Sequence, residues 1–145
     1  MAESDPSNIY PGGIDIMIMR GPTLPQIMTA LEMACGLSAR DIIQPDDDIM
    51  QRLDILQRPL RARILTMSGG DFDYKVDVDG LTPRDYAMLA RQFGAALGHG
   101  VVVLDETKPD PLSAILFRPD TGNIHGYVDD AEPDGATFHS VGYGA

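Results

Sequence analysis

The sequence predicts an α+β fold, a two-layer sandwich in which two main helices pack on one face of a largely antiparallel sheet of about five or six strands. Three observations predict it. Residues 71–79 alternate charged and apolar side chains, as a strand with one buried face does. Residues 23–36 and 82–98 instead repeat apolar side chains at helical spacing. The order of strand, helix, hairpin, helix and further strands favours packing of both helices on the same side of the sheet.

The fold is expected to begin after a short N-terminal segment. Residues 1–13 are rich in Ser, Pro, Asn and Gly and show no periodicity, so we interpret them as a flexible lead-in. Residues 14–145 then form a single domain, because a chain of this length buries enough surface for one stable core. Residues 14–19 alternate isoleucine with aspartate and methionine, which predicts a strand with one apolar face and one mixed face.

The first helix has clear start and stop signals. Thr23 and Gln26 have the spacing of a capping box, and Gly36 follows the last apolar residue of the helical stripe. Residues 38–41 repeat the capping pattern on a shorter scale, and residues 49–56 are consistent with a further short helix. The chain between the first helix and the next strand is therefore expected to contain only short helical turns.

A hairpin is predicted from residues 60–67, which form a strand, and residues 71–79. A two-residue turn would place the arginines of the first strand among core side chains, at a cost of several kcal/mol unless they were paired. A three-residue turn over residues 69–71 removes this conflict, because the arginines then face the carboxylates of the second strand. We therefore expect the three-residue turn.

This register has consequences for the second face of the sheet. It sets Arg63 opposite Asp77 and Arg61 opposite Asp79, which predicts two cross-strand ion pairs. It leaves two carboxylates at the turn end without partners, Asp71 and Asp73. Met67 lies on this face, and Met17 and Met19 join it if the mixed face of their strand lies on the same side of the sheet. They form either an adaptable surface for a protein partner or, if residues 37–58 cover them, part of the core.

The second half of the chain predicts one more helix and four strands. Thr82 is the expected N-cap of the helix in residues 82–98. A short apolar run predicts a buried strand, and a hairpin and a last strand follow it in residues 101–104, 114–118, 123–128 and 137–141. The last strand is expected at an edge of the sheet, where it offers a route to a homodimer.

Composition limits the classes of partner. The chain has 22 acidic and 11 basic side chains and a formal net charge of −11, which disfavours nucleic acid and anionic membranes and favours a basic protein surface. Its single cysteine, Cys35, forms no internal disulfide, and the first residues lack the pattern of a secretory signal. These features predict a cytoplasmic protein.

No motif in the sequence specifies a reaction or a cofactor. Residues 77–80 have the acidic-glycine pattern of a calcium loop, but that register places Lys75 and Tyr86 where oxygen ligands are required. Glycine-rich phosphate-binding motifs are absent from the sequence, and we expect no metal or cofactor. The alternative is a small enzyme or ligand-binding domain whose site is assembled around His125 and His139.

The acid excess and the lack of catalytic motifs favour a non-enzymatic function. We expect a protein-binding domain that engages a basic partner, for example an inhibitor or immunity-type protein that neutralises a toxin. Its partner-binding carboxylates are expected at the hairpin turn and in the acidic loop before the last strand: Asp71, Asp73, Asp129, Asp130, Glu132 and Asp134.

Overall fold

The computed structural model describes residues 12–67, 69–81, 86–105, 108–110, 112–119, 122–129 and 136–140. Its strands are β1 (Gly12–Met19), β2 (Ile42–Ile43), β3 (Arg61–Thr66), β4 (Phe72–Leu81), β5 (Val101–Leu104), β6 (Ser113–Arg118), β7 (Gly122–Asp129) and β8 (Thr137–Ser140). The α-helices are α1 (Leu24–Cys35) and α2 (Tyr86–Leu97), and three 3-10 helices are η2 (Ala39–Asp41), η3 (Ile49–Gln51) and η4 (Leu53–Gln57).

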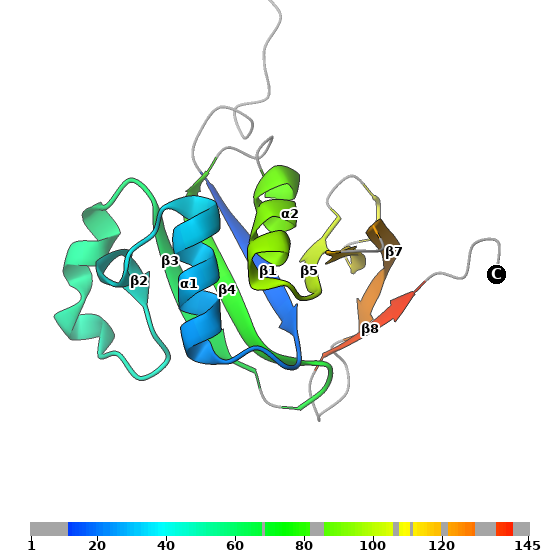
Figure 1. Cartoon of the computed structure of the whole chain (residues 1–145), viewed down its shortest axis with the longest axis horizontal. Coiled ribbons are helices and arrows are strands. Elements are labelled where there is room, and N and C mark those ends of the chain that lie inside the picture. The colour runs from blue at the N-terminus through cyan, green and yellow to red at the C-terminus, as the bar shows by residue number, and fades with distance from the viewer. Residues whose placement is uncertain are drawn as a thin grey trace, which may run out of the picture.

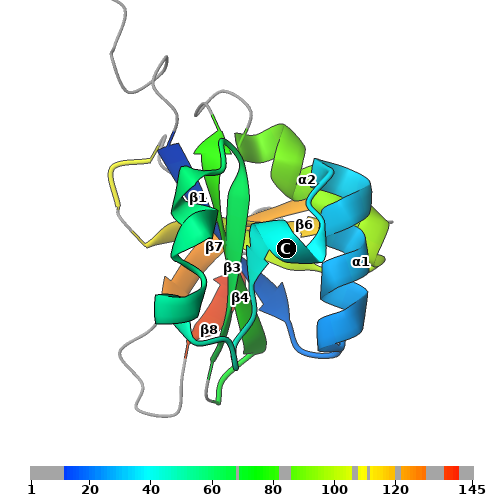
Figure 2. The ribbon, with the colours of Figure 1, turned by 90° about the vertical axis from the view of Figure 1, so that its left-hand side faces the viewer.

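The described strands form one open, mostly antiparallel sheet in the order β2-β3-β4-β1-β5-β6-β7-β8. Only β2 and β3 are parallel neighbours among the described pairs. Helices α1 and α2 pack against each other on one side of this sheet (Figures 1 and 2). The predicted α+β class is confirmed, although the sheet has eight strands rather than five or six. Seven of these strands correspond to segments that the sequence indicated, and only β2 was missed, because two residues are too few to show periodicity.

The larger core lies between the two helices and the sheet. Its sheet side is formed by the isoleucines of β1 and by alternate residues of β3, β4 and β5. The helices contribute Ile27 and Leu31 from α1 and Leu89 and Phe93 from α2. These positions follow the helical spacing seen in the sequence, so the apolar stripe of each helix is the face that is buried.

The ends of α1 agree with the sequence signals. Thr23 Oγ1 accepts the backbone N–H of Gln26, and the Gln26 side chain accepts the backbone N–H of Thr23, which completes the capping box. Gly36 closes the helix in the left-handed conformation at φ 70°. Gly98 ends α2 in the same way at φ 69°, whereas the predicted N-cap, Thr82, lies outside the described residues.

The register of the β3–β4 hairpin is the predicted one. Arg63 lies opposite Asp77 and Arg61 lies opposite Asp79, while Ala62 is buried on the helix side. This confirms the argument that excluded the two-residue turn. The length of the turn could be predicted from the sequence because only one register keeps the arginines out of the core.

The unbroken alternation of residues 71–79 is nevertheless misleading at its first residues. Between Tyr74 and Phe72 the pairing of β4 with β1 shifts, so that Met19 lies opposite Phe72. Tyr74 packs with the helix-side core, whereas Phe72 is fully buried in a second cluster. The expectation that all the apolar residues of this run share one face is therefore wrong, because the irregularity at Asp73 turns Phe72 to the other side.

This second cluster lies on the sheet face opposite the helices. Its buried members are Met17, Phe72, Val102, Ala114, Leu116, Val128 and Ala136, with Met19, Met67, Ile124 and Phe138 packed around them. The methionines are thus core or core-lining residues, as one of the two alternatives required. The residues that pack with them come from strands β5 to β8 and Ala136 rather than from the 37–58 segment.

Candidate functional site

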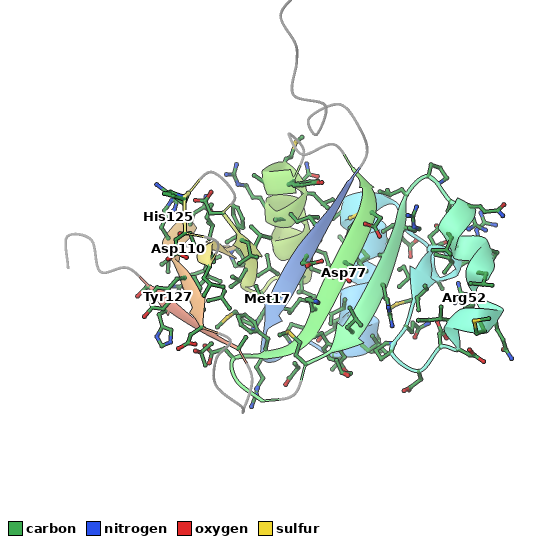
Figure 3. The ribbon with its side chains drawn as sticks, turned by 180° about the vertical axis from the view of Figure 1, so that it is seen from behind. Met17, Arg52, Asp77, Asp110, His125 and Tyr127 are labelled. Atoms are coloured by element: carbon green, nitrogen blue, oxygen red, sulfur yellow. The ribbon has the colours of Figure 1, made fainter. Side chains whose placement is uncertain are left out.

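The central part of the same sheet face carries charged side chains instead of a core. Figure 3 shows it from behind, with Asp77 on β4 beside β1 and no helix in front of these strands. Asp15 lies directly opposite Asp77 across the β1–β4 pair. We refer to Asp15, Asp77 and Asp79 as the carboxylate cluster.

Asp77 is the most perturbed group of this cluster. Its Oδ1 atom is shielded from solvent and has no hydrogen-bond partner, and the ammonium group of Lys75 is 4.0 Å away. Burial raises the pKa of the Asp77 carboxyl to about 7, and a hydrogen bond shared with Asp15 and the negative charge of Asp15 add to this increase. Lys75 acts in the opposite direction and does not cancel it.

Asp79 is brought to the cluster by a glycine on the neighbouring strand. Gly13 pairs with Asp79, and a β-carbon at Gly13 would collide with the Asp79 carboxylate. The missing side chain therefore leaves the space that the carboxylate occupies. Like Asp15, Asp79 raises the pKa of Asp77 through its negative charge.

The two predicted cross-strand ion pairs do not form in the described part of the chain. Arg61 Nη1 donates to the carbonyl oxygen of Arg58 at 3.1 Å instead of pairing with Asp79. Asp77 forms a long ion pair with Lys75 instead of the predicted pair with Arg63, whose side chain is exposed. Correct register thus places the arginines beside the carboxylates without neutralising them, because the Arg61 guanidinium is held by a backbone acceptor nearby.

The prediction that Asp71 and Asp73 lack partners is wrong. The Asp71 carboxylate accepts the backbone N–H of Phe138 at 2.9 Å, and the Asp71 backbone N–H donates to Ala136 at 2.9 Å. Asp73 pairs with Arg20 at 3.3 Å, with both side chains about half exposed. Asp71 therefore attaches the hairpin turn to the start of β8, which is a structural role that the local sequence did not indicate.

The acidic loop is described only at its first residue. Asp129 ends β7 opposite Thr137 and already has an interaction partner. The other three predicted binding residues, Asp130, Glu132 and Asp134, lie outside the described residues. The structure does bring the hairpin turn to the start of β8, and of the loop carboxylates only Asp129, opposite Thr137, can be placed relative to that turn.

The two histidines of the enzymatic alternative lie on neighbouring strands at the end of the sheet. His139 lies opposite Tyr127, on whose ring it stacks with centroids 5.0 Å apart, and its Nε2 atom is 3.0 Å from Thr137 Oγ1. His125 lies on β7 as well, two positions before Tyr127, and both histidines are exposed. Their surroundings add no support for a catalytic site.

The described residues contain no group of three or more His, Cys, Asp or Glu side chains placed to hold a metal ion. Cys35 packs against the main core, and its burial raises the pKa of the thiol to about 11, which disfavours a reactive thiolate. Neither described α-helix has the length and hydropathy needed to cross a membrane.

Sequence reasoning missed Asp15 as a site residue. The alternation of residues 14–19 shows that Asp15 shares a face with Met17, but nothing local indicates that β1 inserts between β4 and β5. That long-range pairing is what places Asp15 against Asp77. The available signal was the presence of acidic residues on the mixed faces of two predicted strands.

Comparison of this chain with protein-family models, with curated proteins and with solved structures found no match.

Proposed function

We propose that this chain is a non-enzymatic, cytoplasmic protein-binding domain that engages a basic protein partner through the carboxylate cluster on its open sheet face. An inhibitor that covers a basic cleft, as immunity-type proteins cover a toxin, is the concrete form of this proposal. The net charge of −11 supports it, because long-range attraction speeds the encounter with a basic partner.

The observation that carries the proposal is the Asp77 carboxyl, whose charge Lys75 compensates only in part. A half-buried carboxylate beside two others, with one oxygen atom lacking any hydrogen bond, is costly to ionise. A lysine or arginine side chain from a partner, reaching the cluster at the exposed Asp15, would add positive charge beside these carboxylates. The free protein is therefore arranged so that a cation bound at this position relieves repulsion between its own residues.

The test measures protons as well as affinity. A partner captured from native cells is purified, and its binding is followed by isothermal titration calorimetry at pH 7 in buffers with different ionisation enthalpies. Because a group with a pKa of about 7 is half protonated there, a cation that contacts Asp77 should release up to about half a proton. The affinity should also fall as salt is added.

Substitutions assign the effect to the cluster. Asp77→Asn should abolish the proton release, and Asp15→Asn together with Asp77→Asn should weaken binding by roughly tenfold or more. Glu32→Gln is the matched control, since Glu32 is an exposed carboxylate on α1 and should affect neither quantity. Unchanged affinity and unchanged proton release in the double variant would show that the partner binds elsewhere.

A further inference from the structure

A second feature of the surface is apolar. Four large side chains on the two 3-10 helices after β2 are each more than a third exposed: Ile49 at 38%, Met50 at 73%, Leu53 at 46% and Leu56 at 60%. We call these four residues the apolar edge patch. Single exposed apolar residues are common on soluble proteins, but four within one short segment are characteristic of an interaction surface.

The segment is fixed rather than loose, so the exposure is a property of the fold. Ile55 is 1% exposed and anchors η4 in the interior. Arg52 connects the segment to the residues on either side of β2. Its guanidinium donates to the carbonyl oxygen of Arg40 at 3.0 Å and pairs with Asp47 at 3.0 Å. Because the backbone of this segment is already ordered, binding need not pay the cost of ordering a loose loop, which favours affinity.

The apolar edge patch meets the open sheet face at Ile49. A pocket lies between the two, lined on one side by Asp47 and Ile49 and on the other by Arg63 and Leu65 of β3. Arg63 in turn lies opposite Asp77. Figure 3 shows Arg52, which joins η3 to η4, at the edge of the sheet, on the β3 side of Asp77.

We infer that one basic protein partner binds both the carboxylate cluster and the apolar edge patch. The patch supplies the apolar contacts of this shared interface. This inference rests on the proposed function and adds a second contact area to it. An interface of this kind has an apolar centre and a charged rim, and truncation of a few central apolar side chains removes most of the affinity.

Charge favours a basic partner over a second copy of this chain. Arg52 and Arg58 are neutralised by Asp47 and Asp41, at 3.0 Å and 3.1 Å. Around the patch three exposed carboxylates, Asp46, Asp48 and Asp54, then outnumber two exposed arginines, Arg40 and Arg63. Two copies joined through this surface would bring like charges together, in addition to the repulsion between two chains of charge −11 each.

The first experiment uses photo-crosslinking in native cells. A benzoylphenylalanine is placed at the position of Met50 and, as a control, at the position of Met33, which is 70% exposed on α1. The inference expects one discrete basic protein crosslinked through position 50 and none through position 33. A crosslink between two copies of the chain, or no discrete product at position 50, would overturn it.

The second experiment measures the affinity for the captured partner after purification. Leu53→Ser and Leu56→Ser, both exposed and therefore compatible with folding, should each weaken binding by roughly tenfold or more, and Met33→Ser should leave it unchanged. If both leucine variants bind normally while Asp77→Asn and Asp15→Asn together weaken binding, this inference fails and the proposed function stands. If the leucine variants weaken binding and the aspartate variants do not, the partner uses the patch alone and the shared interface is wrong.

Discussion

The face of the sheet opposite the helices has two parts that differ sharply in chemistry. One part is a closed apolar cluster that contains Phe72 and Met17 and includes Ala136, just before β8. The other part is open and contains the carboxylate cluster. Strands β1 and β4 contribute side chains to both parts, so this face of neither strand is apolar or charged along its whole length.

The boundary between the two parts is set by how much of β4 the C-terminal strands cover. The hairpin turn contacts the start of β8 through the backbone of Asp71 and through its carboxylate. This contact closes the sheet over Phe72 but ends before Asp77. One irregularity in β4, near Asp73, therefore decides which residues of this strand enter the second core and which remain available on the surface.

The largest loss of stability is expected from a substitution in the closed apolar cluster. Phe72→Ala removes a fully buried aromatic ring from the second cluster and should lower the free energy of unfolding by about 3–5 kcal/mol. Urea denaturation followed by circular dichroism measures it. Asp79→Ala on the same strand removes a partly exposed carboxylate from the open part and should cost far less. Equal losses in the two variants would contradict the division of the face.

A smaller effect is expected from a single methyl group at the turn. Gly70 has φ 72°, and a β-carbon on it would collide with the backbone of Ala136. Gly36 has nearly the same φ, 70°, with no atom near its β-carbon position. Gly36→Ala should therefore cost about 1 kcal/mol for the left-handed conformation alone, and Gly70→Ala about 2–3 kcal/mol because the contact with Ala136 is lost as well.

The measurement for this pair is again the urea midpoint, with hydrogen exchange of β8 as a second readout. Gly70→Ala should speed exchange of the Phe138 amide, which donates to Asp71, whereas Gly36→Ala should not. If the two glycine variants lose the same stability and leave the Phe138 amide equally protected, then the turn does not hold β8.

The sequence predicted the fold wherever one segment contained the whole signal. The capping box at Thr23, the closing Gly36 and the hairpin register of Arg63 with Asp77 follow from side chains a few positions apart or on adjacent strands. The alternation of residues 71–79 also predicted a strand, but periodicity cannot reveal a shift in pairing at Asp73, since that depends on β1. Local pattern therefore gave the elements and not their long-range partners.

The candidate site depends on those long-range partners, which is why the sequence predicted it less well. The choice of Asp71 and Asp73 assumed that a carboxylate without a cross-strand arginine is free, but Phe138 and Arg20 are supplied by distant segments. Asp15 was missed for the same reason. The exposed residues of η3 and η4 could have been suspected from their apolar side chains, although the sequence does not show which of them face outward.

The smallest effect tests the open part through pH. The folded pKa of Asp77 is about 7, compared with an ordinary value of 3.8, so the folded chain holds a proton that the unfolded chain releases between these two values. Ionisation of Asp77 therefore lowers stability as the pH rises from about 4 to about 7, and has no further effect above that range. Asparagine mimics the protonated carboxyl, so Asp77→Asn should match the wild type near pH 4.

Above pH 7, Asp77→Asn should be more stable than the wild type, by up to about 1 kcal/mol because solvent screens this partly exposed group. The difference between the two urea midpoints across the pH range reports on Asp77 together with its interactions with Asp15 and Asp79, since every other group is common to both proteins. Glu32→Gln, exposed on α1, should show no such pH-dependent gain. A difference in stability that stayed constant from pH 4 to pH 8 would mean that Asp15 and Asp79 do not destabilise the ionised form of Asp77. The carboxylate cluster would then not be expected to attract a cation.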